Sequence, residues 1–125
     1  MATALVIEDD DDIRGLLEVV LEQAGYAVAA AATGAAGMQA LAVQEPDLML
    51  VDVGLPDVEG YDLVRQARPL ISGHIVMLSA RSQESDAQLG LEAGADEYLT
   101  KPFRPRDLRA QLAGIVAGAV GRDPR

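Results

Sequence analysis

Short apolar runs alternate with segments of helical periodicity along the chain, and this alternation constrains the fold more than any other feature. Leu48–Val51 contains no polar residue, as expected for a central strand of a parallel sheet that is covered on both faces. Between Ile13 and Leu21, apolar residues instead recur every three or four positions, which is the pattern of a helix with one buried face. Strand–helix units joined by right-handed crossovers place helices on both faces of a sheet, so the sequence predicts an α/β domain with a doubly wound parallel sheet.

The same pattern predicts five strands and five helices in a single domain of this 125-residue chain. The strands are expected at residues 5–7, 27–31, 48–51, 75–78 and 98–100. The helices are expected from Ile13 to Gly25, after Thr33 as the capping residue, around Leu63 to Ala67, at 84–93 and at 106–117. In the second helix, Met38, Leu41 and Ala42 are expected to face the core. The domain is expected to span residues 1–118, with 119–125 as a flexible tail or the start of a linker.

Composition and charge argue against several classes of function. The formal net charge of −10 argues against direct contact between this domain and nucleic acid, whose phosphates attract basic surfaces. The chain has no cysteine, which excludes disulfides and thiolate metal sites and fits a cytoplasmic protein. No apolar run approaches the roughly 20 residues that cross a bilayer, so no membrane segment is expected.

Acidic residues crowd the end of the first predicted strand, at Glu8–Asp12. Two like charges at close range repel by roughly 4 kcal/mol at a surface-like dielectric, so the crowding requires a reason. For Asp10–Asp12 the reason is the start of a helix, whose dipole favours acids. Glu8 and Asp9 differ, because Asp52 ends the third strand and the carboxyl ends of parallel strands share one edge. Carboxylates that converge there need a cation, and oxygen ligands with an open face favour Mg²⁺ over Mn²⁺ or Ca²⁺.

Two further polar residues end strands at the same edge. Lys101 follows the fifth strand and Ser79 ends the fourth, so an ammonium and a hydroxyl join the carboxylates. Taken singly, Lys101 could form a salt bridge and Ser79 a hydrogen bond to backbone. Together with a metal they form a clamp for phosphoryl oxygens, and Asp52 becomes the nucleophile. Ala80, which follows Ser79, is small and leaves the approach open.

Four sequence motifs in order resemble the receiver domain of two-component response regulators. They are "LVIEDD", "PDLMLVDVGLPDVEGYDL", "IVMLSA" and "GADEYLTKPF", and the resemblance extends from Ala4 to about Val116. It implies a flavodoxin-like fold with strand order 2-1-3-4-5. It also implies a signalling domain that accepts a phosphoryl group from a histidine kinase or a phosphotransfer protein, with Mg²⁺ as cofactor. Beyond self-phosphorylation and slow self-dephosphorylation, no enzymatic activity is implied.

The resemblance also assigns roles to individual residues. Asp52 is the phosphoacceptor, and the phosphate-binding and switch residues are Ser79, Ala80, Tyr98, Lys101 and Pro102. The metal ligands are Glu8, Asp9, Asp52 and the backbone carbonyl of Gly54. A cis bond between Lys101 and Pro102 is implied. Phosphorylation is expected to change the surface formed by the fourth helix, fifth strand and fifth helix.

Departures from the family pattern bear on the output. Gly54 replaces a larger residue, often Met, which removes cover over the acyl phosphate. Leu89 and Gln111 stand where winged-helix transcription regulators show basic residues that form a dimer. The acids of that pairing are present, at Asp96, Glu97 and Asp107. We therefore expect a monomer or a weak phosphorylation-dependent dimer, acting on a partner protein or on an effector domain beyond residue 125.

Other functions fit parts of the sequence. Haloacid-dehalogenase-type phosphatases also use a strand-end Asp, Mg²⁺, a hydroxyl and a Lys, but their second acid would stand at Gly54. A flavin site would need donors and aromatics, whereas the first loop is acidic and aromatics make up 3%. A receiver-shaped module that no longer uses phosphorylation is the more serious alternative, and the complete set of edge residues argues against it. His74, the only histidine, begins a strand and is expected to have a loop-end role and not a catalytic one.

Overall fold

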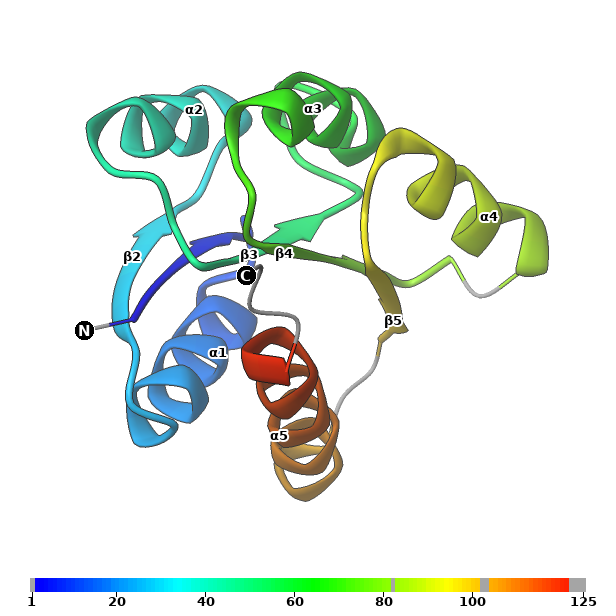
Figure 1. Cartoon of the computed structure of the whole chain (residues 1–125). Coiled ribbons are helices and arrows are strands. Elements are labelled where there is room, and N and C mark those ends of the chain that lie inside the picture. Colours follow the sequence, from blue (N-terminus) through cyan, green and yellow to red (C-terminus); the bar gives the residue numbers. More distant parts are fainter. Residues whose placement is uncertain (1, 82, 102–103, 122–125) are drawn as a thin grey trace.

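The computed structural model describes residues 2–81, 83–101 and 104–121. A single five-stranded parallel sheet runs through the centre in the order β2-β1-β3-β4-β5, so the predicted strand order is confirmed (Figure 1). The strands are β1 (Thr3–Ile7), β2 (Ala27–Ala31), β3 (Leu48–Asp52), β4 (His74–Ser79) and β5 (Glu97–Thr100).

Helices cover both faces of this sheet, with α2, α3 and α4 on one face and α1 and α5 on the other (Figure 1). The helices are α1 (Asp11–Gln23), α2 (Gly34–Val43), α3 (Gly60–Ala67), α4 (Glu84–Ala93) and α5 (Pro105–Gly121), with a short 3₁₀ turn at Arg68–Leu70. Among the described residues, no helix is long and apolar enough to cross a membrane.

Alternate residues of the strands supply two separate hydrophobic cores. In β1, Leu5 and Ile7 join the core under α2, α3 and α4, whereas Ala4 and Val6 join the core under α1 and α5. Every residue of β3 and β4 is buried, which explains the uninterrupted apolar sequence of β3. Because helices cover both faces, the polar side chains Glu8, Asp52 and Ser79 lie at the carboxyl ends of the strands.

The acids at the start of α1 act as the sequence predicts. The Asp10 side chain caps the helix by accepting hydrogen bonds from the backbone N–H groups of Asp12 and Ile13, at 2.9 and 3.0 Å. Asp11 lies in the first turn and pairs with Arg14 at 2.5 Å. These acids therefore belong to the helix and are separate in role from Glu8.

Helix α2 begins as predicted, and two of the three residues predicted to face the core do so. Thr33 caps it by accepting a hydrogen bond from the Ala36 N–H at 3.1 Å. Leu41 is buried and Met38 is half-buried, but Ala42 is exposed, so the prediction that Ala42 faces inward is wrong. The reason is helix geometry, because residue 42 lies about 100° around the axis from Leu41.

Gly37 occupies the place of closest contact between α2 and the sheet. A Cβ atom at Gly37 would lie 2.4 Å from the Cδ1 of Ile7. Since no side chain fits there, the helix packs through Gly37 and its neighbours along the axis, Gly34 and Leu41.

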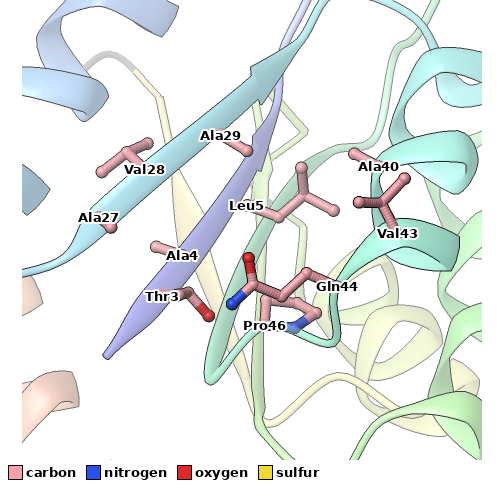
Figure 2. Close-up of a pocket in the computed structure, with 10 residues that line it drawn as sticks. All are labelled: Thr3, Ala4, Leu5, Ala27, Val28, Ala29, Ala40, Val43, Gln44 and Pro46. Atoms are coloured by element: carbon pink, nitrogen blue, oxygen red, sulfur yellow. The ribbon is translucent and has the colours of Figure 1, made fainter. Parts of the chain in front are cut away.

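A cavity lies at the amino ends of β1 and β2 (Figure 2). It has a volume of about 330 Å³ and runs between these strands and the end of α2, from Ala29 to Val43 and Pro46. No charged side chain lines it. It is therefore separate from the acidic edge at the carboxyl ends of the strands.

Candidate phosphoacceptor site

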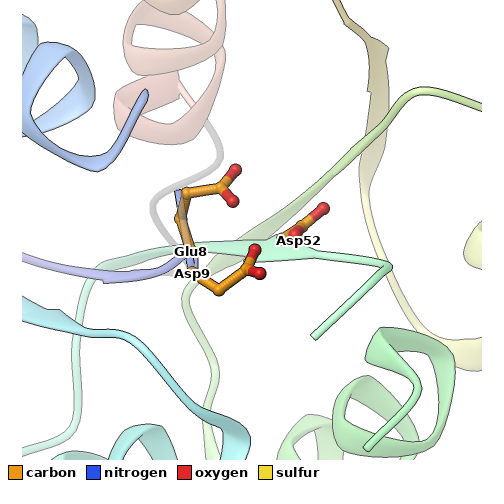
Figure 3. Close-up of side chains that lie close together, drawn as sticks. All are labelled: Glu8, Asp9 and Asp52. Carbon is orange, nitrogen blue, oxygen red and sulfur yellow. The ribbon is translucent and has the colours of Figure 1, made fainter. Parts of the chain in front are cut away.

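Three carboxylates converge at the carboxyl edge of the sheet. Glu8 and Asp9 directly follow β1 and Asp52 ends β3, and their carboxylate oxygens lie within 4.8 Å of one another (Figure 3). Glu8 and Asp52 are buried, with exposed fractions of 0% and 5%, while Asp9 is open to solvent. The adjacent parallel strands β1 and β3 produce this convergence, as the sequence predicts.

Lys101 closes the cluster from the end of β5. Its Nζ lies 2.7 Å from the Oε1 of Glu8 and 3.1 Å from the Oδ1 of Asp52. Its backbone N–H donates to the Ser79 carbonyl at 2.7 Å, which fixes the start of the segment after β5. Burial works to lower the pKa of Lys101, but the two carboxylates outweigh it and raise that pKa. The ammonium group is therefore charged at neutral pH.

One ammonium group does not balance the three carboxylates of this cluster. Burial raises the pKa of Glu8 from 4.5 to about 7; the contact with Lys101 lowers it, and the nearby Asp52 charge raises it. Among the described residues, the possible metal ligands that converge here are the carboxylate oxygens of Glu8, Asp9 and Asp52, which are hard donors. Both the excess negative charge and the donor type fit a divalent cation such as Mg²⁺.

Gly54 lies two residues after Asp52, in the segment that joins β3 to α3. Its N–H donates a hydrogen bond to the Oδ1 of Asp52 at 3.4 Å, and it forms an antiparallel bridge with Glu59. A Cβ atom at Gly54 would have no neighbour within 4 Å, so packing does not require a glycine at this position.

Ser79 and Tyr98 both bind the backbone of Arg81. The buried Ser79 hydroxyl accepts a hydrogen bond from the Arg81 N–H at 2.9 Å, and the Tyr98 hydroxyl donates to the Arg81 carbonyl at 2.8 Å. One residue of the β4–α4 segment thus connects the two residues that the family pattern assigns to a switch. Ala80, which lies between Ser79 and Arg81 in the sequence, is exposed. Pro102 lies outside the described residues.

Sequence reasoning missed the side chain of Arg81. Its guanidinium pairs with Glu59 at 3.3 Å and lies 5.9 Å from the centre of the Tyr61 ring. These contacts join the segments after β3 and β4 on either side of Asp52. An arginine two positions after a strand carries no sequence signal for such a contact.

Other residues noted in the sequence lie away from this edge. Asp96 pairs with Arg68 at 3.1 Å and accepts a hydrogen bond from the Ile75 N–H at 2.8 Å, so it is engaged within the fold. His74 is buried at the amino end of β4, opposite the acidic edge, so the prediction that it begins a strand is confirmed. Leu89 is exposed on α4.

Comparison with known proteins decides the family. The sequence model of the family described as the response regulator receiver domain matches residues 4–113 of this chain. The chain belongs to the response regulator receiver family. Receiver domains of this family are signalling domains of two-component systems and not enzymes of the usual kind, which agrees with the prediction from the motifs.

The relatives of this receiver domain are bacterial transcriptional regulators. It is 41% identical over 116 residues to the transcriptional regulatory protein AfsQ1 of Streptomyces coelicolor, covering 93% of this chain and 52% of that protein. It is 44% identical over 118 residues to the transcriptional regulatory protein GltR of Pseudomonas aeruginosa, covering 92% of this chain and 49% of that protein. The receiver domain thus spans about half the length of these curated relatives.

Solved structures agree with the fold. A CheY-like response regulator receiver domain protein from Methanospirillum hungatei JF-1 is 30% identical, with a TM-score of 0.86, covering 97% of this chain and 98% of that one. The BeF3-activated DrrB receiver domain is 31% identical, with a TM-score of 0.80 over 94% of this chain and 98% of that one. The flavodoxin-like α/β fold predicted from the sequence is confirmed.

Proposed function

We propose that Asp52 accepts a phosphoryl group from a histidine kinase in a Mg²⁺-dependent reaction. The observation that carries the proposal is the position of Asp52. Its carboxylate lies within 4.8 Å of carboxylate oxygens of Glu8 and Asp9, and its Oδ1 lies 3.1 Å from the Nζ of Lys101. A phosphoryl group bound there would meet the positive charge of Lys101 and, once a cation is bound, the charge of that cation.

The metal would be held by Glu8, Asp9, Asp52 and the carbonyl of Gly54. When bound, it neutralises charge that develops on the phosphoryl oxygens. Lys101 supplies a second positive charge, and the Ser79 hydroxyl is a donor for a phosphoryl oxygen. The absence of a side chain at Gly54, where a Cβ atom would meet open space, fits the approach of a phosphodonor.

The transfer itself requires few protein groups. One Asp52 carboxylate oxygen attacks phosphorus, the bond between phosphorus and the phosphohistidine nitrogen breaks, and an acyl phosphate forms. The imidazole leaves with the electron pair of that bond and takes a proton from solvent. With acetyl phosphate as donor, the phosphorus–oxygen bond breaks and acetate leaves.

The output follows from the contacts of Arg81. A phosphoryl group adds roughly −1.5 to −2 charge and three acceptor oxygens, by analogy with phosphorylated hydroxyl residues. Ser79 then exchanges its hydrogen bond from the Arg81 N–H for a bond to the phosphoryl group. Because Tyr98 binds the carbonyl of Arg81, the exchange alters Tyr98 and with it the surface of α4, β5 and α5. An output domain or a partner protein would read that surface.

Intact-protein mass spectrometry with acetyl phosphate tests the proposal. The wild-type protein is expected to gain one phosphoryl mass with Mg²⁺ and none with a chelator. Asp52→Asn should abolish the gain, whereas the matched control Asp47→Asn, at the amino end of β3, should retain it. Modification without Mg²⁺, or modification of Asp52→Asn, would contradict the proposed acceptor.

A further inference from the structure

Asp57 connects the segment after β3 to the start of α2. Its Oδ1 accepts a hydrogen bond from the Gly34 N–H at 2.8 Å, and its Oδ2 accepts one from the Ala35 N–H at 2.9 Å. Both carboxylate oxygens are therefore used by a helix more than twenty residues away in the sequence. These two hydrogen bonds, that from Gly34 being the stronger influence, lower the pKa of Asp57.

Helix α2 is built to receive this carboxylate. Its first turn contains no acidic residue of its own, and the Thr33 side chain satisfies only the Ala36 N–H. Gly34 permits the close approach, because a Cβ atom there would lie 2.3 Å from the Cγ1 of Val58 and 3.2 Å from the Oδ1 of Asp57. The negative charge that favours a helix start is thus supplied by another segment.

The segment that carries Asp57 also carries Gly54. The Gly60 N–H donates to the Val53 carbonyl at 2.7 Å, and the bridge between Gly54 and Glu59 closes the turn. Gly54 has no side chain to pack, and the space around it is open. The turn is therefore positioned by its own hydrogen bonds, by Leu55 and Val58, which pack against the core under α2, α3 and α4, and by the two hydrogen bonds that Asp57 accepts.

We propose that Asp57 is a positioning residue for the metal site. By tethering the turn to α2, it holds in place Gly54, whose backbone nitrogen lies 3.4 Å from the Oδ1 of Asp52 and whose carbonyl is a proposed metal ligand. This inference rests on the proposed function, since it assumes that Mg²⁺ binds there. Loss of residues that orient metal ligands typically weakens metal binding by about 10- to 100-fold, and we expect Asp57→Ala to weaken Mg²⁺ binding by about tenfold.

Asp57→Ala removes both the tether of the turn and the negative charge at the start of α2. A second substitution in α2 separates these two effects. Ala35 is exposed in the first turn, so Ala35→Glu gives the helix an acid of its own. The double variant Asp57→Ala/Ala35→Glu thus restores the charge at the helix start without restoring the tether. Asp57 is also exposed, so its removal leaves no cavity in the core.

Calorimetric titration with MgCl₂ and thermal unfolding followed by circular dichroism test the inference on four proteins. These are wild type, Asp57→Ala, Ala35→Glu and the double variant. We expect the double variant to regain the unfolding temperature of wild type but to keep the weaker Mg²⁺ binding of Asp57→Ala. Ala35→Glu should bind Mg²⁺ as wild type does.

Each other outcome overturns a distinct claim. Wild-type affinity in Asp57→Ala, or in the double variant, would show that the tether does not position the metal site. Absence of Mg²⁺ binding by the wild-type protein would overturn the proposed function and this inference together. If Asp57→Ala does not fold, the comparison of wild type with the double variant gives the answer.

Discussion

At the scale of single residues, environment separates acids that the sequence presents as one run. Asp10 caps α1 and Asp11 lies in its first turn, whereas Glu8 is buried beside Lys101 and Asp52. Sequence alone could predict this division, because Glu8 follows an apolar strand directly. It could not predict the roles of Asp57 and Arg81, whose partners lie more than twenty residues away on segments that only the folded turn brings near.

Asp57 gives a prediction for the dependence of stability on pH. Folding lowers the pKa of the Asp57 carboxyl below its ordinary value of 3.8. The ionised carboxyl therefore stabilises the folded protein at pH values above 3.8, and this stabilisation is lost as the pH falls through the lowered pKa. Asp57→Ala should therefore be less stable than wild type at neutral pH, and the difference should shrink below pH 3.8. Urea unfolding of both proteins at a series of pH values measures it. A difference that persists at the lowest pH at which both fold would contradict the charged contact.

At the scale of elements, glycines decide how closely helices approach the sheet. In α1, a Cβ atom at Gly15 would meet no neighbour within 4 Å, whereas at Gly37 in α2 it would meet Ile7 at 2.4 Å. Gly15→Ala should therefore stabilise the protein by up to about 1 kcal/mol through helix propensity. Gly37→Ala should destabilise it by about 1–3 kcal/mol, because the overpacked contact outweighs the same propensity. Equilibrium urea unfolding checks the pair, and equal effects of the two substitutions would contradict the packing described here.

The proposed switch also involves several elements, because Ser79 of β4 and Tyr98 of β5 both contact Arg81 in the segment after β4. With beryllofluoride as a mimic of the phosphoryl group, backbone NMR shifts should change at Ser79, Arg81 and Tyr98. In Ser79→Ala, Asp52 should still be modified by acetyl phosphate, but the shift changes at Tyr98 should be largely lost. Unchanged shifts around Tyr98 in the wild-type protein would rule out the proposed switch.

At the scale of the whole molecule, the sequence predicted the strand order, the two helix layers and the edge that bears the site. These features depend on apolar periodicity and on the family motifs, which are local in the sequence. The wrong prediction for Ala42 has a different origin. In α2 nearly every residue is apolar or small, so the pattern does not say which face is buried, and the contact of Gly37 with Ile7 decides it.

Dimerisation of the molecule is expected to depend on the surface formed by α4, β5 and α5. Leu89 and Gln111 lack the charges of the dimer pairing, and Asp96 is engaged with Arg68. We predict that beryllofluoride produces at most a weak dimer, with half-association above micromolar concentrations. Sedimentation equilibrium with and without beryllofluoride measures this, and a dimer that persists at nanomolar concentration would contradict it.

The central claim is that Asp52, and no other carboxylate of the cluster, receives the phosphoryl group, and the most direct measurement is the location of that group. Cleavage after arginine, which spares the Arg68–Pro69 bond, separates Glu8 and Asp9, in residues 1–14, from Asp52, in residues 15–65, and from Ser79, in residues 66–81. After labelling with acetyl phosphate and Mg²⁺ and reduction of the acyl phosphate with borohydride, fragmentation of these peptides identifies the modified residue. We predict modification at Asp52 alone; modification at Glu8, Asp9 or Ser79, or at no residue, would contradict the account.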